Sequence, residues 1–306
     1  LAVLSVWFVI QALWIASDSH WVWAELRGQW LKDIAFWILG LVLGAGALCQ
    51  RQSHKNQWLV ALLVGLISIV LLTAAEGCWV WVSTGTMPTF FNGITGSRTM
   101  VSFVTNMLLA FLVGDLLARD AVAQFLPCKK AVTFGLIIIC LICSVFIATR
   151  HGWIGIAMLT VSGLAIHYIK GWHRVSKKAL LLLPILILLL SVGAWFSWKN
   201  DPRWNTLKQT LGSGKHAHSS MIDLAIGGGL PAVVLWLAFV GTLVGYGAVA
   251  FFRHGSGAGL VLAFLTSGFF GRSLLDSVMR DHSMEQFLFI IAFLLPIVSW
   301  DLCNKT

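Results

Sequence analysis

The residues best suited to chemistry lie in the segment HAHSSMIDLAIGGGLP, where a short polar stretch meets a long apolar run. A neutral imidazole accepts protons near physiological pH, so His218, which is followed by Ser219, is a candidate general base. Asp223 lies five residues further on, placed either to orient that imidazole or to cap or pair elsewhere. His216 completes a His-x-His pair, but no Cys, third His or carboxylate cluster stands around it at ligand spacing. We therefore expect no metal and no other cofactor.

Three glycines, residues 227–229, and Pro231 interrupt the apolar run that follows these histidines. Irregular backbone at membrane depth is tolerated only where it faces protein or a water-filled cavity. Small residues also let helices approach each other closely. The interruption therefore predicts either a cavity beside the histidines or a simple kink at which helices pack.

Two arginines stand at the edges of apolar segments with no acidic residue close by in the sequence. Arg98 lies in GITGSRTM and Arg150 in IATRHGWIG, and both are flanked by glycine. A single arginine in such a place can simply extend its charge toward the membrane surface. Two of them on one side favour the binding of a phosphate or pyrophosphate, because the planar guanidinium binds oxyanions through paired hydrogen bonds.

Further basic residues on the same side are second candidates for contacts with phosphate groups, among them Lys32, Lys215 and Arg272. Near the C-terminus, Arg272, Asp276 and Arg280 follow an i, i+4, i+8 spacing and would share one face of a helix. This pattern predicts an ion-pair ladder that holds helix ends together. The alternative is that these residues line an acceptor site.

The elements that must position these residues are membrane-spanning helices. The 306-residue chain is 58% hydrophobic and only 11% charged, whereas soluble domains have about 25% charged residues. We predict an all-α, polytopic transmembrane helix bundle that forms a single integral-membrane domain over residues 1–306, surrounded by membrane lipids and without a nucleic-acid partner. The apolar runs of spanning length predict about ten helices, at residues 1–17, 31–49, 58–75, 99–118, 131–149, 152–171, 179–198, 224–252, 257–274 and 285–300.

The loops between these helices bear on orientation. Lys and Arg are divided almost equally between the two sets of loops, so their number alone does not orient the chain. One set contains the short basic loops QRQSHK and HRVSKK, which are typical of the cytoplasmic side. Asp115 belongs to the same set. The other set includes Arg98, Arg150 and the loop at 199–219 that leads into His218.

The six cysteines lie mostly in apolar runs or on the cytoplasmic side and predict no disulfide framework.

Three of these segments resemble motifs of the O-antigen ligase family. His218, Ser219, nine further residues and Gly229 are similar to the family's His-[Asn/Ser/Gln]-x9-Gly signature. Residues 149–153, Thr-Arg-His-Gly-Trp, resemble the family's Ser-Arg-Gly-x-Trp stretch that closes a helix. Residues 96–98, Gly-Ser-Arg, resemble a third family position at the start of a helix.

The resemblance implies a bacterial inner-membrane glycosyltransferase of the GT-C type with its active site facing the periplasm. Such enzymes transfer a glycan from undecaprenyl pyrophosphate to a sugar hydroxyl of lipid A-core, are independent of metal and invert the anomeric centre. Family members have about twelve helices, so we expect about two to be absent from the N-terminal side of this chain. We predict His218, Arg150 and Arg98 as catalytic residues, and Lys32, Lys215, Arg272, Arg280 and His216 as substrate-binding residues.

Two other classes of function remain open. An O-antigen polymerase or a protein O-oligosaccharyltransferase uses the same donor and differs in the acceptor. A secondary transporter or flippase of an anionic lipid would use the broken helix as its substrate site and would place charges near the middle of the bilayer.

Overall fold

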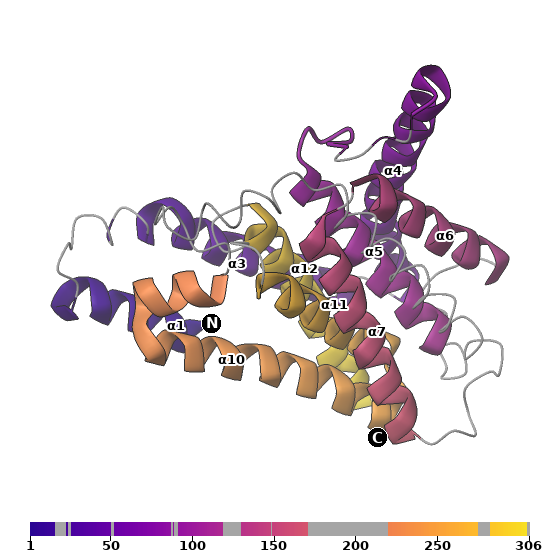
Figure 1. Ribbon diagram of the computed structural model, residues 1–306. Coiled ribbons are helices and arrows are strands. Elements are labelled where there is room, and N and C mark those ends of the chain that lie inside the picture. Colours follow the sequence, from indigo (N-terminus) through magenta and orange to yellow (C-terminus); the bar gives the residue numbers. More distant parts are fainter. Residues whose placement is uncertain are drawn as a thin grey trace, which may run out of the picture.

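The computed structural model describes residues 1–15, 23, 26–49, 52–86, 88, 91–118, 130–147, 149–170, 220–274 and 282–304, and within these ranges the chain is all-helical (Figure 1). The α-helices are α1 (Ala2–Ile10), α3 (Leu31–Cys49), α4 (Gln52–Thr84), α5 (Arg98–Ala118), α6 (Lys130–Ile147), α7 (Arg150–Lys170), α10 (Ser220–His254), α11 (Gly257–Ser273) and α12 (His282–Asn304). Two π-helical segments, η1 (Gln11–Ile15) and η2 (Leu26–Trp30), follow α1 and precede α3. The helix predicted at 179–198 and the loop at 199–219 lie outside the described residues.

Five helical stretches in the described part of the chain are long and apolar enough to cross a membrane: Leu26–Cys49, Leu59–Thr84, Arg98–Leu117, Gly228–His254 and His282–Cys303. About 20 apolar residues in a helix are enough to span the hydrocarbon core of a bilayer. The helices thus fit the multi-pass membrane class that the composition predicts.

Helix α11 lies at the centre of the bundle, where it packs against α5, α7, α10 and α12. Apart from Phe270, every residue of α11 is buried, as expected of a helix that is apolar around its whole circumference. Its close approach to α10 depends on Gly259 and Gly247. A Cβ atom on either glycine would overlap the backbone oxygen of the other.

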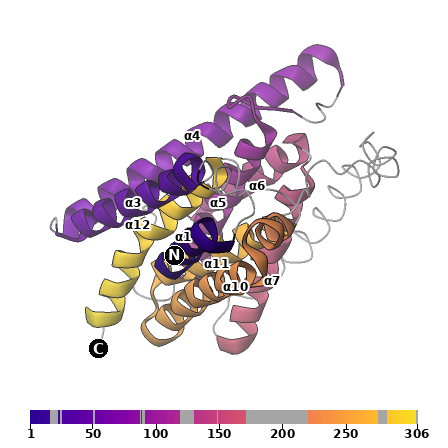
Figure 2. The same cartoon turned by 90° about the vertical axis from the view of Figure 1, so that its left-hand side faces the viewer.

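Helices α3 and α12 lie side by side (Figure 2) and meet at a second glycine contact. Gly40 and Gly44, one turn apart on α3, face the backbone of Phe289 and Phe293 on α12, and a Cβ atom at either glycine would overlap those carbonyl oxygens. This is the small-xxx-small arrangement by which membrane helices pack without a hydrophobic driving force between them.

Helix α4 is longer than the sequence predicts. The predicted segment ends at residue 75, whereas α4 continues to Thr84 and extends past its neighbours at the top of Figures 1 and 2. The exposed Glu76 does not end the helix, because glutamate is a good helix former. Beyond it, Trp79 and Trp81 are 72% and 48% exposed, as expected of aromatic residues in a membrane interface.

Two smaller predictions are also corrected. Asp115, placed by the sequence in a cytoplasmic loop, lies inside α5 and is buried. Arg150 opens α7 instead of closing the preceding helix, since α6 already ends at Ile147. Cys140 and Cys143, which the sequence places in an apolar run, are buried in α6.

The predicted break in α10 is confirmed and lies at Gly229. This residue has φ 68° and ψ −177°, a backbone conformation that is essentially restricted to glycine. Figure 1 shows that α10 changes direction sharply. The indole nitrogen of Trp7 donates a hydrogen bond of 2.9 Å to the carbonyl oxygen of Gly228, and Phe8 lies against the same glycine. On the side that α1 covers, the break is therefore a close-packed kink.

We expect Gly229→Ala to lower the free energy of unfolding by about 1–3 kcal/mol, because alanine is strained in this conformation. Gly241→Ala is the matched control, since a Cβ atom there meets nothing and alanine favours the helix. Denaturant unfolding of the two purified proteins in detergent measures the difference. Equal stability of the two variants would contradict the role of Gly229.

Candidate functional site

Arg98 reaches its position through a tight turn that leads into α5. Gly93 and Gly96 in this turn have positive φ angles of 62° and 68°, and the amide of Gly96 donates a 3.0 Å hydrogen bond to the carbonyl of Gly93. Ser97 then accepts the first helical hydrogen bond of α5, from the amide of Val101 at 3.1 Å. The predicted Gly-Ser-Arg start of a helix is thus confirmed, and the partly buried Arg98 is the first residue of α5.

The start of α7 is hydrogen-bonded to the start of α5. The hydroxyl of Thr149, the residue before Arg150, donates to the hydroxyl of Ser102 at 2.9 Å. One turn further along α5, the side-chain amide of Asn106 donates to the carbonyl of Gly152 at 3.2 Å. We call Ser102, Asn106, Thr149, Gly152 and Gly155 the α5–α7 seam.

A backbone hydrogen bond joins the segments on the other side of the same region. The amide of Phe91, in the segment that leads to Arg98, donates to the carbonyl of Phe146 in the last turn of α6 at 3.3 Å. Together with the α5–α7 seam, this bond brings the backbones of Arg98 and Arg150 to one end of the bundle. The side chain of Arg150 lies outside what the structure describes.

Arg272, predicted as a phosphate contact, lies in the last turn of α11 and is fully buried. Its guanidinium carbon is 5.2 Å from the centre of the Phe103 ring on α5, a cation–π contact. Its Nη2 atom donates to the hydroxyl of Ser283 on α12 at 3.4 Å. Arg272 therefore joins α11 to α5 and α12 at the end of the bundle that carries Arg98, while its contact with substrate stays a prediction.

Three aromatic rings pack together next to the Arg272 guanidinium. Phe103 meets Phe269 edge to face with ring centres 5.7 Å apart, and Phe269 stacks on Phe287 at 3.9 Å. The three rings come from α5, α11 and α12. They form an apolar cluster beside the charged end of the bundle.

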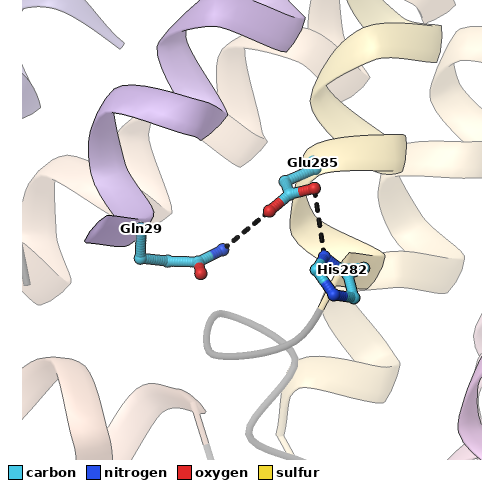
Figure 3. A network of polar contacts seen from close by, with 3 residues as sticks. All are labelled: Gln29, His282 and Glu285. Atoms are coloured by element: carbon cyan, nitrogen blue, oxygen red, sulfur yellow. Dashed lines mark hydrogen bonds and ion pairs between the residues drawn. The ribbon is translucent and has the colours of Figure 1, made fainter. Parts of the chain in front are cut away.

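A polar network lies where α12 begins (Figure 3). Glu285 accepts hydrogen bonds through both carboxylate oxygens, from the amide of Gln29 at 3.5 Å and from Nδ1 of His282 at 3.2 Å. Glu285 is buried, whereas the His282 side chain is 71% exposed. Asp33, near the start of α3, is only 1% exposed. The neighbouring Lys32 is exposed.

Sequence reasoning missed most of this network. The contact between His282 and Glu285 could have been predicted from the sequence, since residues three positions apart lie on one face of a helix. The contact of Gln29 could not, because it lies 256 positions from its partner. The predicted ladder of Arg272, Asp276 and Arg280 is untested, because α11 ends at Ser273 and the other two residues lie outside the described part.

The predicted residues His216, His218, Lys215 and Arg280 lie outside the described residues, as does the side chain of Asp223. Helix α10 begins at Ser220, two residues after His218. Their predicted roles therefore stay predictions.

Among the residues that the structure describes, no group of three or more His, Cys, Asp or Glu side chains is arranged to hold a metal ion.

No family model matches the chain, and neither a curated protein nor a solved structure matches it.

Proposed function

We propose that the chain is a glycosyltransferase of the GT-C type that acts as an O-antigen ligase in the bacterial inner membrane, with its site facing the periplasm. The observation that carries the proposal is the pairing of two arginine-bearing helix starts, Arg98 on α5 and Arg150 on α7, through the hydrogen bond from Thr149 to Ser102. Cations at the positive ends of two helices suit a doubly charged phosphate group. The donor in this proposal is a glycan linked to undecaprenyl pyrophosphate, and the acceptor is a sugar hydroxyl of lipid A-core.

The two arginines hold the pyrophosphate and stabilise the negative charge that grows on it as the glycosidic bond breaks. Preorganised cations of this kind act more strongly in the transition state than in the ground state. Because pyrophosphate is a good leaving group, the reaction needs no general acid.

His218 takes the proton from the acceptor hydroxyl as the oxygen attacks the anomeric carbon from the face opposite the pyrophosphate. This geometry inverts the anomeric configuration, and a neutral imidazole is suited to the proton transfer. Lys32, Lys215, Arg272, Arg280 and His216 are further candidates for substrate contacts.

An O-antigen polymerase or a protein O-oligosaccharyltransferase would use the same arginines and differ only in its acceptor. A lipid transporter or flippase is the alternative from another class. The observation in favour of this alternative is that two carboxylates inside predicted spans, Asp33 and Asp115, are buried. Both lie in the end turns of α3 and α5, whereas coupling charges of transporters lie near the middle of the bilayer.

The test is a lipopolysaccharide gel profile in a Gram-negative strain that lacks its ligase and still makes lipid-linked O-antigen and a compatible core. We expect the full-length gene to restore the O-antigen ladder and the His218→Ala variant, at equal abundance, to leave it absent. If the well-expressed parent restores no ladder, the ligase proposal is wrong for that donor and acceptor.

A further inference from the structure

We propose that Trp7 is a positioning residue that fixes the angle between the two parts of the broken helix α10. We call residues 220–228 the short arm of α10 and residues 230–254 the long arm. The indole nitrogen of Trp7, on α1, donates a 2.9 Å hydrogen bond to the carbonyl oxygen of Gly228, at the end of the short arm. The inference rests on the proposed function only in its effect on transfer, because that function assigns the general base to His218, which precedes the short arm.

The backbone at the break does not fix this angle by itself. Gly229 has a φ angle of 68°, and two further glycines precede it in the sequence. Glycine has the widest range of backbone conformations of any residue, so this stretch resists bending only weakly. Pro231 has no amide proton to donate to the preceding turn. The angle between the two arms is therefore set by contacts from other elements.

The hydrogen bond from Trp7 meets a need of the backbone at the break. The non-helical conformation of Gly229 interrupts the regular bonding between residues four positions apart, as happens at the end of any helix, where carbonyl groups are left to find other partners. Gly228 is buried, and buried backbone carbonyl groups are nearly always paired. The indole N–H supplies a partner from 221 positions away. Removal of that N–H thus takes a donor from a buried carbonyl group.

Helix α1 also packs closely on the break. A Cβ atom on Gly228 would lie 3.2 Å from the ring of Phe8, the residue after Trp7. Leu4, one turn earlier on α1, is buried in the hydrophobic core. A directional hydrogen bond and a ring contact therefore act on the same glycine, and together they fix both the distance and the orientation of the short arm relative to α1.

Helix α1 is itself held in place by η2. The indole nitrogen of Trp30 donates to the hydroxyl of Ser5 at 3.0 Å, and the Trp30 ring meets Phe8 edge to face with ring centres 4.9 Å apart. The preceding residue, Gln29, donates to Glu285 on α12 at 3.5 Å. The support of α1 thus extends through η2 to the start of α12, which makes α1 a fixed point for the short arm.

A small change of angle at the break produces a larger displacement at the far end of the short arm. The short arm is about 12 Å long, so a rotation of about 10° moves its first residue, Ser220, by about 2 Å. Ser220 lies two residues after His218. A misplacement of about 1 Å can cost a factor of about 100 in rate. Loss of the Trp7 hydrogen bond should therefore lower kcat and spare the KM for the donor, which the proposed function assigns to arginines on other helices.

The experiment removes the indole N–H of Trp7 in two ways. Trp7→Phe keeps an aromatic ring and loses the donor. A second variant carries 3-benzothienylalanine at position 7, an analogue with nearly the size and shape of tryptophan in which sulfur replaces the N–H group. The same two replacements at Trp14, which lies in η1 and is 76% exposed, are the matched controls.

Each full-length protein is purified in detergent. Hydrogen–deuterium exchange is measured for peptides that cover the short arm and for peptides that cover the long arm, and the unfolding temperature is recorded. Transfer assays give kcat and the KM for the glycan-bearing donor.

We expect both replacements of Trp7 to raise the exchange rate of the short-arm amides by about two- to tenfold, the effect of one net hydrogen bond. Exchange in the long arm should not change. The kcat for transfer should fall by about tenfold, while the KM for the donor stays within about twofold of the parent. The Trp14 replacements should behave as the parent. A merely structural role of Trp7 would raise exchange in both arms, and the loss of activity would follow the unfolding temperature.

The outcomes separate this inference from the proposed function. If the short arm of the 3-benzothienylalanine variant exchanges at the parent's rate, the ring alone is sufficient and the inference is wrong. Faster exchange with an unchanged kcat also overturns it, because the angle of the short arm would then not matter for transfer. If the parent transfers no glycan, the ligase proposal fails, and the exchange rates alone decide whether Trp7 holds the short arm.

Discussion

Replacement of Arg98 or of Arg150 by alanine is expected to lower kcat/KM for glycan transfer by at least about 100-fold, the usual effect of removing one preorganised charge-stabilising group. The physical reason is that each cation offsets charge that grows on the leaving pyrophosphate. Lysine keeps the charge and loses the planar fork, so Arg98→Lys and Arg150→Lys should keep a small part of the activity. The measurement is transfer by the purified protein from a lipid pyrophosphate donor.

Arg253→Ala is the control for this prediction, because Arg253 is an exposed basic residue in the last turn of α10, far along the chain from both helix starts. It should transfer glycan at the parent's rate. An Arg98→Ala or Arg150→Ala protein that is folded and has parent-like kcat/KM would remove these arginines from the mechanism.

Gly247→Leu is expected to cost about 3 kcal/mol of unfolding free energy, at the upper end of the usual cost of overpacking. A side chain at this position meets the carbonyl of Gly259 and the backbone of Ala263 on α11, and backbone cannot move aside as a flexible side chain can. Helix α11 contacts four other helices, so its displacement would disturb the whole core. Denaturant unfolding in detergent measures the loss.

Gly245→Leu is a closely matched control, since it is the same substitution two residues away on the same helix. Gly245 is exposed, and a Cβ atom there meets nothing. The leucine at 245 should leave the unfolding free energy within about 0.5 kcal/mol of the parent. If both leucines cost the same, the contact between α10 and α11 is not the reason for the loss.

The helices themselves were largely predictable, because each apolar run is long enough to define one. The predicted segments at 31–49 and 99–118 match α3 and α5 to within a residue. The break at Gly229 was predictable as well, since three glycines and a proline leave few other conformations. The end of α4 was not, because one exposed glutamate in an apolar run looks like a boundary and is compatible with a continuing helix.

The arrangement of the candidate site was less predictable. Arg98 and Arg150 stood out because arginine is rare and costly beside apolar segments. Ser102, Asn106 and Thr149 did not, because small polar residues in membrane helices are common. Thr149 lies 47 positions from Ser102, and no local pattern pairs them.

The sequence by itself determined that this chain forms long apolar helices of membrane-spanning length, where most of them begin, and which rare charged residues lie at their ends. These properties depend on composition and local periodicity, and both can be recognised within a stretch of about 20 residues. Only the tertiary structure decided that α11 is central, that Arg272 is buried against Phe103, and that Gln29 reaches Glu285. Such contacts depend on how distant surfaces fit together, and the short-range pattern of a sequence carries little information about that fit.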